Sequence, residues 1–200
     1  MKIIGITGPS GAGKTTLSTL LKSNYNATII DADAVAKKLS TDITSEYYKE
    51  MVKLFGKGTL QEDKQLNRKK IAVIIYNDRE KKRALNKLTF KYVVDDINRQ
   101  VEELRNSEYE YLGIDVPLLY EAKMEKICDY VIAVVAEDKE KVLRICKRDN
   151  ISEDLAKKRL EIQNNNEFFA SKADFVIHND GSLDKLEKSL EEIIEKIWEK

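Results

Sequence analysis

The chain has 200 residues, 42% of them hydrophobic, which suits one compact α/β domain with an inserted or appended subdomain. Lys and Arg together number 35, as do Asp and Glu, so a formal net charge of zero favours neither a nucleic acid nor a membrane surface as partner. No apolar run approaches the roughly 20 residues that span a bilayer, no signal peptide is recognisable, and the cysteines lack metal-ligand spacing, so we expect a cytoplasmic protein.

Short apolar stretches alternate with helical patterns along the chain. Strands are predicted at residues 2–7, 27–31, 111–115, 130–135 and 175–178. This alternation favours a parallel five-stranded sheet with helices on both faces, in which ligands bind at the carboxyl ends of the strands. Those ends carry Gly8, Asp31 with Asp33, Asp115 and Asn179.

The first predicted strand leads into a run from Gly8 to Thr15 that fits G-x-x-x-x-G-K-[ST] completely. Backbone N–H groups of such a loop surround an anion, and glycines stand where side chains would block the approach. We expect Lys14 to reach the β- and γ-phosphates of a nucleotide and the Thr15 hydroxyl to hold Mg²⁺. The alternative is a glycine-rich turn with a surface lysine.

The second predicted strand ends in Asp31-Ala32-Asp33. A carboxylate at this place can orient an attacking hydroxyl and accept its proton. We take Asp33 as the candidate base and leave Asp31 as a helix cap or as support for the metal. The alternative is that either aspartate only caps the helix that follows.

The long segment between the second and third strands is mostly helical, with helices predicted at residues 45–54, 68–76 and 79–105. It is too long for a simple crossover, so we predict a helical insert over residues 41–110 within a single domain, 1–200.

A second helix pair, at residues 139–148 and 152–165, follows the fourth strand, and we predict a lid over residues 137–166. Arg144 and Arg148 are four residues apart and share one helical face, so they could clamp a triphosphate and exclude water. The alternative is a solvated face, because lysines surround both arginines.

The C-terminal segment has one apolar helical face that is predicted to pack on the sheet, with dimerisation through it as the alternative. We therefore expect a monomer or a weak homo-oligomer. The face consists of Leu183, Leu186, Leu190, Ile193 and Ile197.

The run from Gly8 to Thr15 has the pattern of a P-loop. Together with the motifs that follow it in a fixed order, it resembles the dephospho-CoA kinase family from about residue 3 to about residue 181. These motifs are Asp31–Ala36, Phe55-Gly56, Leu66–Arg68, Leu85–Thr89, the D-x-P-L-L-[FY]-E element Asp115–Glu121, Arg144–Asp149 and Ile177–Gly181.

This resemblance implies a P-loop NTPase-type three-layer α/β fold with a helical acceptor-binding insert and a helical lid. It implies ATP-dependent phosphorylation of the ribose 3′-hydroxyl of dephospho-CoA, giving CoA and ADP. Asp33 would then activate the acceptor hydroxyl, and Lys14, Arg144 and Arg148 would complete the catalytic set. ATP would contact Gly8, Gly11, Ala12, Gly13, Lys14, Thr15, Thr16, Asn179 and Gly181.

The acceptor side implied by the resemblance includes Asp33, Arg68, Pro117, Leu118, Leu119 and Glu121. The two leucines have a second interpretation as ordinary core, and Asn179 with Gly181 could form a plain strand-to-helix turn instead of reading adenine.

Two positions in the insert depart from the family pattern. Phe90-Lys91 stands where the family commonly has His-Pro, and Lys64 replaces the usual glycine of a turn. We expect these changes to alter acceptor binding and not the class of chemistry.

Three other functions are compatible with a P-loop but fit the rest of the sequence less well. Another small P-loop kinase would lack the D-x-P-L-L-[FY]-E element, and a GTP-driven switch would need an N-K-x-D segment that we do not find. A catalytically weak relative is disfavoured because Lys14, Asp33 and both lid arginines are present.

Overall fold

The computed structural model describes residues 1–199 and divides into two compact units. The sheet unit consists of residues 1–30 together with the chain from Arg105 onward, and the helical unit is Asp31–Leu104. None of the helices within residues 1–199 has both the length and the apolar character needed to cross a membrane.

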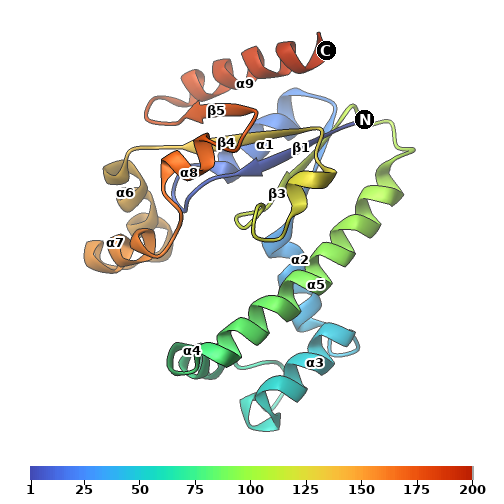
Figure 1. The fold of residues 1–200 in the computed structure, drawn as a ribbon, viewed down its shortest axis with the longest axis vertical. Helices are drawn as coiled ribbons and strands as arrows, with labels where there is room; N and C mark the ends of the chain where they lie inside the picture. Colours follow the sequence, from blue (N-terminus) through green and yellow to red (C-terminus); the bar gives the residue numbers. More distant parts are fainter. Residues whose placement is uncertain (200) are drawn as a thin grey trace. The chain divides into compact units, whose positions relative to one another are not determined.

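The sheet unit is built on five parallel strands in the order β2-β3-β1-β4-β5 (Figure 1). The predicted strands are all confirmed: β1 (Lys2–Thr7), β2 (Ala27–Asp31), β3 (Tyr111–Asp115), β4 (Tyr130–Val135) and β5 (Phe175–His178). The central strand pairs on both sides, with Ile6 opposite Asp115 on β3 and opposite Ile132 on β4. The chain reverses its direction of winding beside β1, so the loop after β1 lies where such sheets bind ligands.

Helices cover both faces of the sheet, as the three-layer fold predicts. On one face, Ile132 and Val134 pack with α1 (Lys14–Asn24) and with the C-terminal α9 (Leu183–Trp198). On the other, Ala133 and Val135 pack on Phe169 of α8 (Asn166–Ala170). Successive β4 side chains therefore alternate between two apolar layers, and both are buried.

The apolar face of α9 lies in the core of its own unit, which confirms the predicted packing on the sheet side. Leu183 is an exception, because it is 55% exposed at the first residue of the helix, whereas Ile194 joins the buried face.

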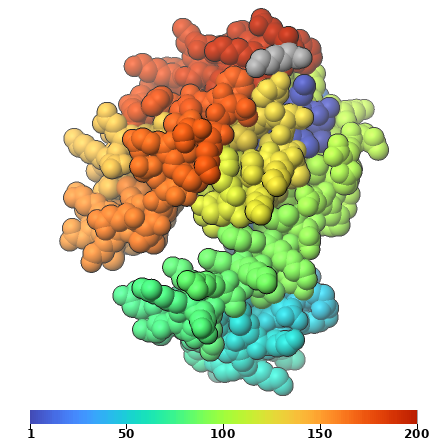
Figure 2. Space-filling model, in the orientation of Figure 1, coloured from blue at the N-terminus to red at the C-terminus, as the bar shows by residue number. Residues whose placement is uncertain are grey.

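Helices α6 (Asp138–Asp149) and α7 (Glu153–Glu161) form the predicted pair after β4, and they occupy one side of the sheet unit, gold to orange in Figure 2. The prediction of one helix as far as Asn165 is wrong. The α7 helix ends at Glu161, and the Asn165 side chain accepts a hydrogen bond from the Phe168 amide and so starts α8.

The helical unit has its own apolar core, formed around Tyr47, Met51 and Phe55. Its elements are α2 (Ala32–Thr41), α3 (Glu46–Phe55), the short 3₁₀ helix η1 (Lys57–Thr59), α4 (Arg68–Asn77) and α5 (Arg79–Leu104). The unit begins earlier than the predicted insert, 41–110, because α2 packs on α3 and α5. It also ends earlier, at Leu104, which is the last residue of α5.

The two departures from the family pattern have different structural outcomes. The α5 helix continues without a break through Phe90 and Lys91. Lys64 has a φ of 65°, so a lysine here adopts the left-handed conformation that a glycine would adopt more easily.

Candidate active site

The loop after β1 has the backbone of a phosphate cradle. Gly8, Gly11 and Gly13 have φ values of 140°, 77° and 107°, a region that side chains rarely adopt. A Cβ at Gly8 would lie 2.1 Å from the Val134 carbonyl oxygen, and one at Gly13 would lie 2.1 Å from the Asn179 amide nitrogen. Only glycine at positions 8 and 13 therefore allows the loop to lie this close to β4 and to the residue after β5.

The residues after the glycines start α1. Lys14 is the first residue of the helix, and its ammonium group donates to the carbonyls of Gly8 at 2.8 Å and Pro9 at 3.0 Å. Thr15 and Thr16 are exposed on the first turn. The helix N-terminus and the loop amides form an environment that favours an anion.

Arg144 on α6 fixes the other side of the loop. Its guanidinium donates to the carbonyls of Gly11 at 3.3 Å, Ala12 at 3.4 Å and Asn179 at 2.8 Å. The Asn179 amide also donates to the Ala12 carbonyl at 2.7 Å. Arg144 is therefore not on a purely solvated face, since it joins the predicted lid, the P-loop and the end of β5.

Arg148 has different partners. It donates to the Asp149 carboxylate at 2.8 Å and to the Ser10 hydroxyl at 3.3 Å, and Arg159 of α7 binds the same carboxylate. These hydrogen bonds, first of all the one from Arg148, lower the pKa of Asp149 to about 2. A charged cluster thus connects α6 with α7 beside the P-loop.

The two aspartates at the end of β2 and the start of α2 have different environments, and Asp31 has the capping role that the sequence analysis considered for it. The Asp31 carboxylate accepts hydrogen bonds from the amides of Asp33 at 2.8 Å and Ala34 at 3.1 Å, so Asp31 is the N-cap of α2. Asp33 is exposed on the first turn of α2 and lines a cavity of about 380 Å³ in the helical unit.

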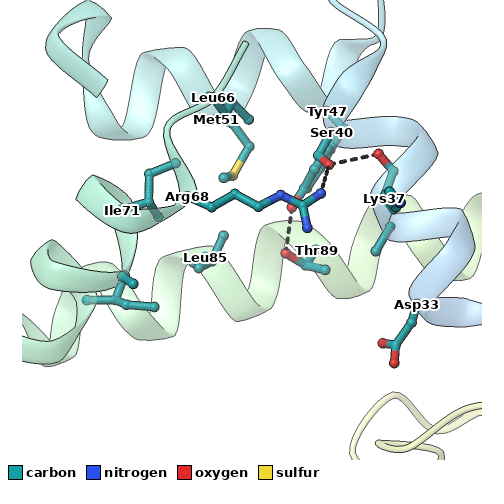
Figure 3. Close-up of a pocket in the computed structure, with 13 residues that line it drawn as sticks. Asp33, Lys37, Ser40, Tyr47, Met51, Leu66, Arg68, Ile71, Leu85 and Thr89 are labelled. Atoms are coloured by element: carbon teal, nitrogen blue, oxygen red, sulfur yellow. Dashed lines mark hydrogen bonds between the residues drawn. The ribbon is translucent and has the colours of Figure 1, made fainter. Parts of the chain in front are cut away.

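This cavity, which we call the helical-unit pocket, has a polar and an aliphatic part (Figure 3). Arg68 reaches across it and donates to the Ser40 hydroxyl at 2.9 Å, and Tyr47 shares a hydrogen bond of 3.0 Å with Thr89. The aliphatic part consists of Met51, Leu66, Ile71, Ala72, Ile75 and Leu85. Of the predicted site residues, Asp33 and Arg68 line this pocket together.

The D-x-P-L-L-[FY]-E element does not present one continuous surface. Leu119 is completely buried and lies against Gly5 of β1, which fits the second interpretation of this leucine as an ordinary core residue. Leu118 is 45% exposed, Pro117 is half-buried, and the exposed Glu121 accepts a hydrogen bond of 2.8 Å from Asn164.

Tyr120 in the same element is packed edge-on against Phe168, with 5.8 Å between the ring centroids. Burial raises the pKa of its phenol to about 12, so this group stays neutral at ordinary pH. We therefore assign Tyr120 to the aromatic core under α8.

No group of three or more His, Cys, Asp or Glu side chains with the arrangement of a metal site occurs within residues 1–199.

Sequence reasoning missed two polar side chains near the P-loop. Gln163 accepts a hydrogen bond of 2.9 Å from the Ser10 amide. Lys141, only 3% exposed, pairs with Asp138 at 2.7 Å and donates to Asn166 at 3.0 Å. The run of amides from Gln163 to Asn166 was the available signal, because clustered amide side chains often bind backbone groups at a turn.

Comparison with known proteins gives a consistent result. A family model described as dephospho-CoA kinase matches residues 2–185. The dephospho-CoA kinase of Carboxydothermus hydrogenoformans is 35% identical over 196 residues, which are 98% of this chain and 94% of that protein.

Two solved structures are similar over nearly their whole length. The protein TT1252 from Thermus thermophilus has a TM-score of 0.80 and 29% identity, with 98% of this chain and 97% of that chain covered. A dephospho-CoA kinase from Campylobacter jejuni has a TM-score of 0.72 and 27% identity, with 98% of both chains covered.

Proposed function

The chain belongs to the dephospho-CoA kinase family, a family of enzymes that convert dephospho-CoA into CoA with ATP, and we propose how its own residues carry out this reaction. Its fold is the P-loop NTPase fold with a parallel five-stranded sheet. The proposal concerns the residues that hold ATP, the base, the lid arginines and the acceptor.

ATP binds with its phosphates in the loop from Gly8 to Thr16. The positive φ angles of the glycines and the start of α1 support this, because backbone amides and the helix N-terminus then face the anion. Lys14 moves from its two loop carbonyls to the β- and γ-phosphates. Asn179 and Gly181, at the end of β5, lie beside the adenine, and Thr15 contributes a ligand to Mg²⁺, which when bound neutralises phosphate charge.

Asp33 orients the acceptor. Its carboxylate accepts the proton of the ribose 3′-hydroxyl as that oxygen bonds to the γ-phosphorus and ADP leaves with the electrons of the broken P–O bond. The observation that carries this assignment is the different environment of the two carboxylates. Asp31 caps α2, whereas Asp33 lines the helical-unit pocket.

The lid arginines act at different stages. Arg144 orders the P-loop through its carbonyls before ATP arrives, whereas Arg148 exchanges the Ser10 hydroxyl for phosphate oxygens as the lid closes. Arg68, Pro117, Leu118 and Glu121 remain on the acceptor side. The enzyme works in the cytoplasm as a monomer or weak homo-oligomer, a proposal supported by the burial of the α9 apolar face in its own core.

The test compares two changes of the same size. Asp33→Asn removes the proton acceptor and lowers kcat at least a hundredfold with the KM for ATP unchanged. Asp31→Asn is the matched control, because asparagine is an equally good N-cap, and it retains kcat within about threefold. Equal kcat values for the two variants in steady-state kinetics would show that Asp33 is not the base.

A further inference from the structure

Ser10 of the P-loop is held by two side chains that come from far along the sequence. Its amide donates to the Gln163 carboxamide oxygen at 2.9 Å, and its hydroxyl accepts from the Arg148 guanidinium at 3.3 Å. Gln163 lies in the turn between α7 and α8, 153 residues from Ser10. The proposed reaction gives Arg148 a role and leaves Gln163 without one.

The turn that carries Gln163 is anchored on both sides of this residue. The Gln163 amide donates to the Leu160 carbonyl at 3.1 Å, which closes the end of α7. The Asn164 side chain donates to Glu121 at 2.8 Å, and Asn165 caps α8. Because these contacts fix the backbone of the turn, they place the Gln163 carboxamide at the P-loop in a defined position.

The Gln163 oxygen uses a backbone group that the loop offers to an anion. The N–H groups of a phosphate cradle face the bound phosphates, and the Ser10 N–H belongs to this loop. A side chain that accepts from the Ser10 N–H therefore lies on the phosphate side of the loop. Gln163 thus lies beside the phosphates once a nucleotide is bound.

The surroundings of Ser10 mark the terminal-phosphate end of the loop. Lys14, which reaches the β- and γ-phosphates in such loops, donates to the Pro9 carbonyl at 3.0 Å, and Pro9 shares this peptide group with Ser10. The other end of the loop, at Gly13, lies against Asn179, which the proposed function puts beside the adenine. The carboxamide is therefore near the γ-phosphoryl group and remote from the base.

We propose that Gln163 binds the γ-phosphoryl group of ATP, with its oxygen on the Ser10 amide and its nitrogen donating to a γ-phosphoryl oxygen. The proposal rests on the function proposed above, since it assumes ATP in the P-loop. Within residues 1–199 the Gln163 side chain forms only the hydrogen bond from Ser10, so its amide nitrogen has both hydrogens to donate. This nitrogen lies at most roughly 5 Å from the Ser10 nitrogen, because the two polar atoms of a carboxamide are about 2.3 Å apart.

ADP lacks the γ-phosphoryl group, so Gln163 should distinguish ATP from ADP. A hydrogen bond to a charged oxygen changes affinity about tenfold or more. The bond to the Ser10 amide is exposed, and water can replace it, so its loss should affect both nucleotides little.

The experiment measures by calorimetry the dissociation constants of ADP and of β,γ-imido-ATP, each with Mg²⁺. The ratio of the two constants is the preference for the ATP analogue. Gln163→Met removes the donor and the acceptor and should lower this preference about tenfold. Gln163→Glu retains an acceptor for Ser10 but puts a carboxylate against the phosphate, and should lower it about a hundredfold. Gln163→Lys retains a donor alone and should keep the preference within about threefold.

Matched controls stand on the preceding residue. Ile162→Glu and Ile162→Lys put the same charges on a side chain that is 81% exposed, and both should keep the wild-type preference within about threefold at an ionic strength of about 0.15 M. Thermal unfolding of all variants separates misfolding from a lost contact.

Three results would overturn this contact. A wild-type preference in Gln163→Glu, together with a lower one in Gln163→Met and Gln163→Lys, would show that only the oxygen matters. Equal losses of affinity for both nucleotides would put Gln163 away from the γ-phosphoryl group, and wild-type preferences in all three variants would leave it without a role.

The binding assay also separates this contact from the proposed function. A wild-type protein that transfers no phosphoryl group to dephospho-CoA would refute the function, while the order of preferences among the Gln163 variants would still decide for or against the contact. A wild-type protein that binds neither nucleotide would refute both.

Discussion

Replacement of Gly13 by alanine tests whether the P-loop geometry carries ATP binding. Gly13 has a φ of 107°, and a methyl group there would lie 2.1 Å from the Asn179 amide nitrogen, which donates to the Ala12 carbonyl. Left-handed backbone costs about 1–2 kcal/mol for a residue with a Cβ. Loss of the buried hydrogen bond adds about 1 kcal/mol. The loop conformation that binds ATP is therefore destabilised by about 2–3 kcal/mol.

Because ATP must restore the loop before it binds, this free energy should appear in ATP use. A cost of about 2–3 kcal/mol corresponds to a fall of roughly 30- to 150-fold in kcat/KM for ATP. Gly58→Ala is the matched control, since its added Cβ meets no atom within 4 Å and its φ is not in the left-handed region. The assay is steady-state kinetics with ATP varied at saturating dephospho-CoA. If Gly13→Ala and Gly58→Ala gave the same kcat/KM, the reasoning from the loop geometry would be refuted.

Two further predictions concern stability. Lys64→Gly should raise the free energy of unfolding by up to about 1 kcal/mol, because it relieves a φ of 65°, and a lower midpoint of thermal unfolding would contradict this. The pKa of Asp149 is lowered to about 2 from the ordinary 3.8 by Arg148 and Arg159, so the stability it contributes is complete above about pH 4 and is lost as the pH falls towards 2. Asp149→Asn should therefore flatten that part of the acid unfolding curve recorded by circular dichroism, and an unchanged curve would argue against the cluster.

The strands could be predicted from the sequence because each is a short, mostly apolar run that alternates with a helical pattern. Buried parallel strands have this pattern on both faces, and β1 and β4 are clear cases. The P-loop could be predicted for a different reason, since its glycines are required by positive φ angles that few other residues adopt.

The end of α7 was missed because Ile162 to Asn165 contain no proline or glycine, although Asn164 and Asn165 are residues that often end or cap a helix. Asn165 acts as a cap only because α8 packs on β4, which is a tertiary contact. The burial of Leu119 has a similar cause. A leucine pair after a strand suits either a substrate surface or a core, and its contact with Gly5, far away in the sequence, decides between them.

The hydrogen-bond partners of Arg144 could not be predicted from the sequence either. A spacing of four residues places Arg144 and Arg148 on one helical face, but the acceptors of Arg144 are backbone carbonyls, which have no sequence signature. The roles of both arginines in phosphoryl transfer stay predictions, as do those of Lys14 and Asp33.

The most direct test of the whole account measures ADP release from ATP and Mg²⁺ with dephospho-CoA, adenosine, AMP, CMP or uridine as acceptor, together with a control without acceptor. We predict release that requires dephospho-CoA, with a product whose mass is that of CoA. Turnover only with a nucleoside or nucleotide, or binding of ATP without turnover on any acceptor, would contradict the account.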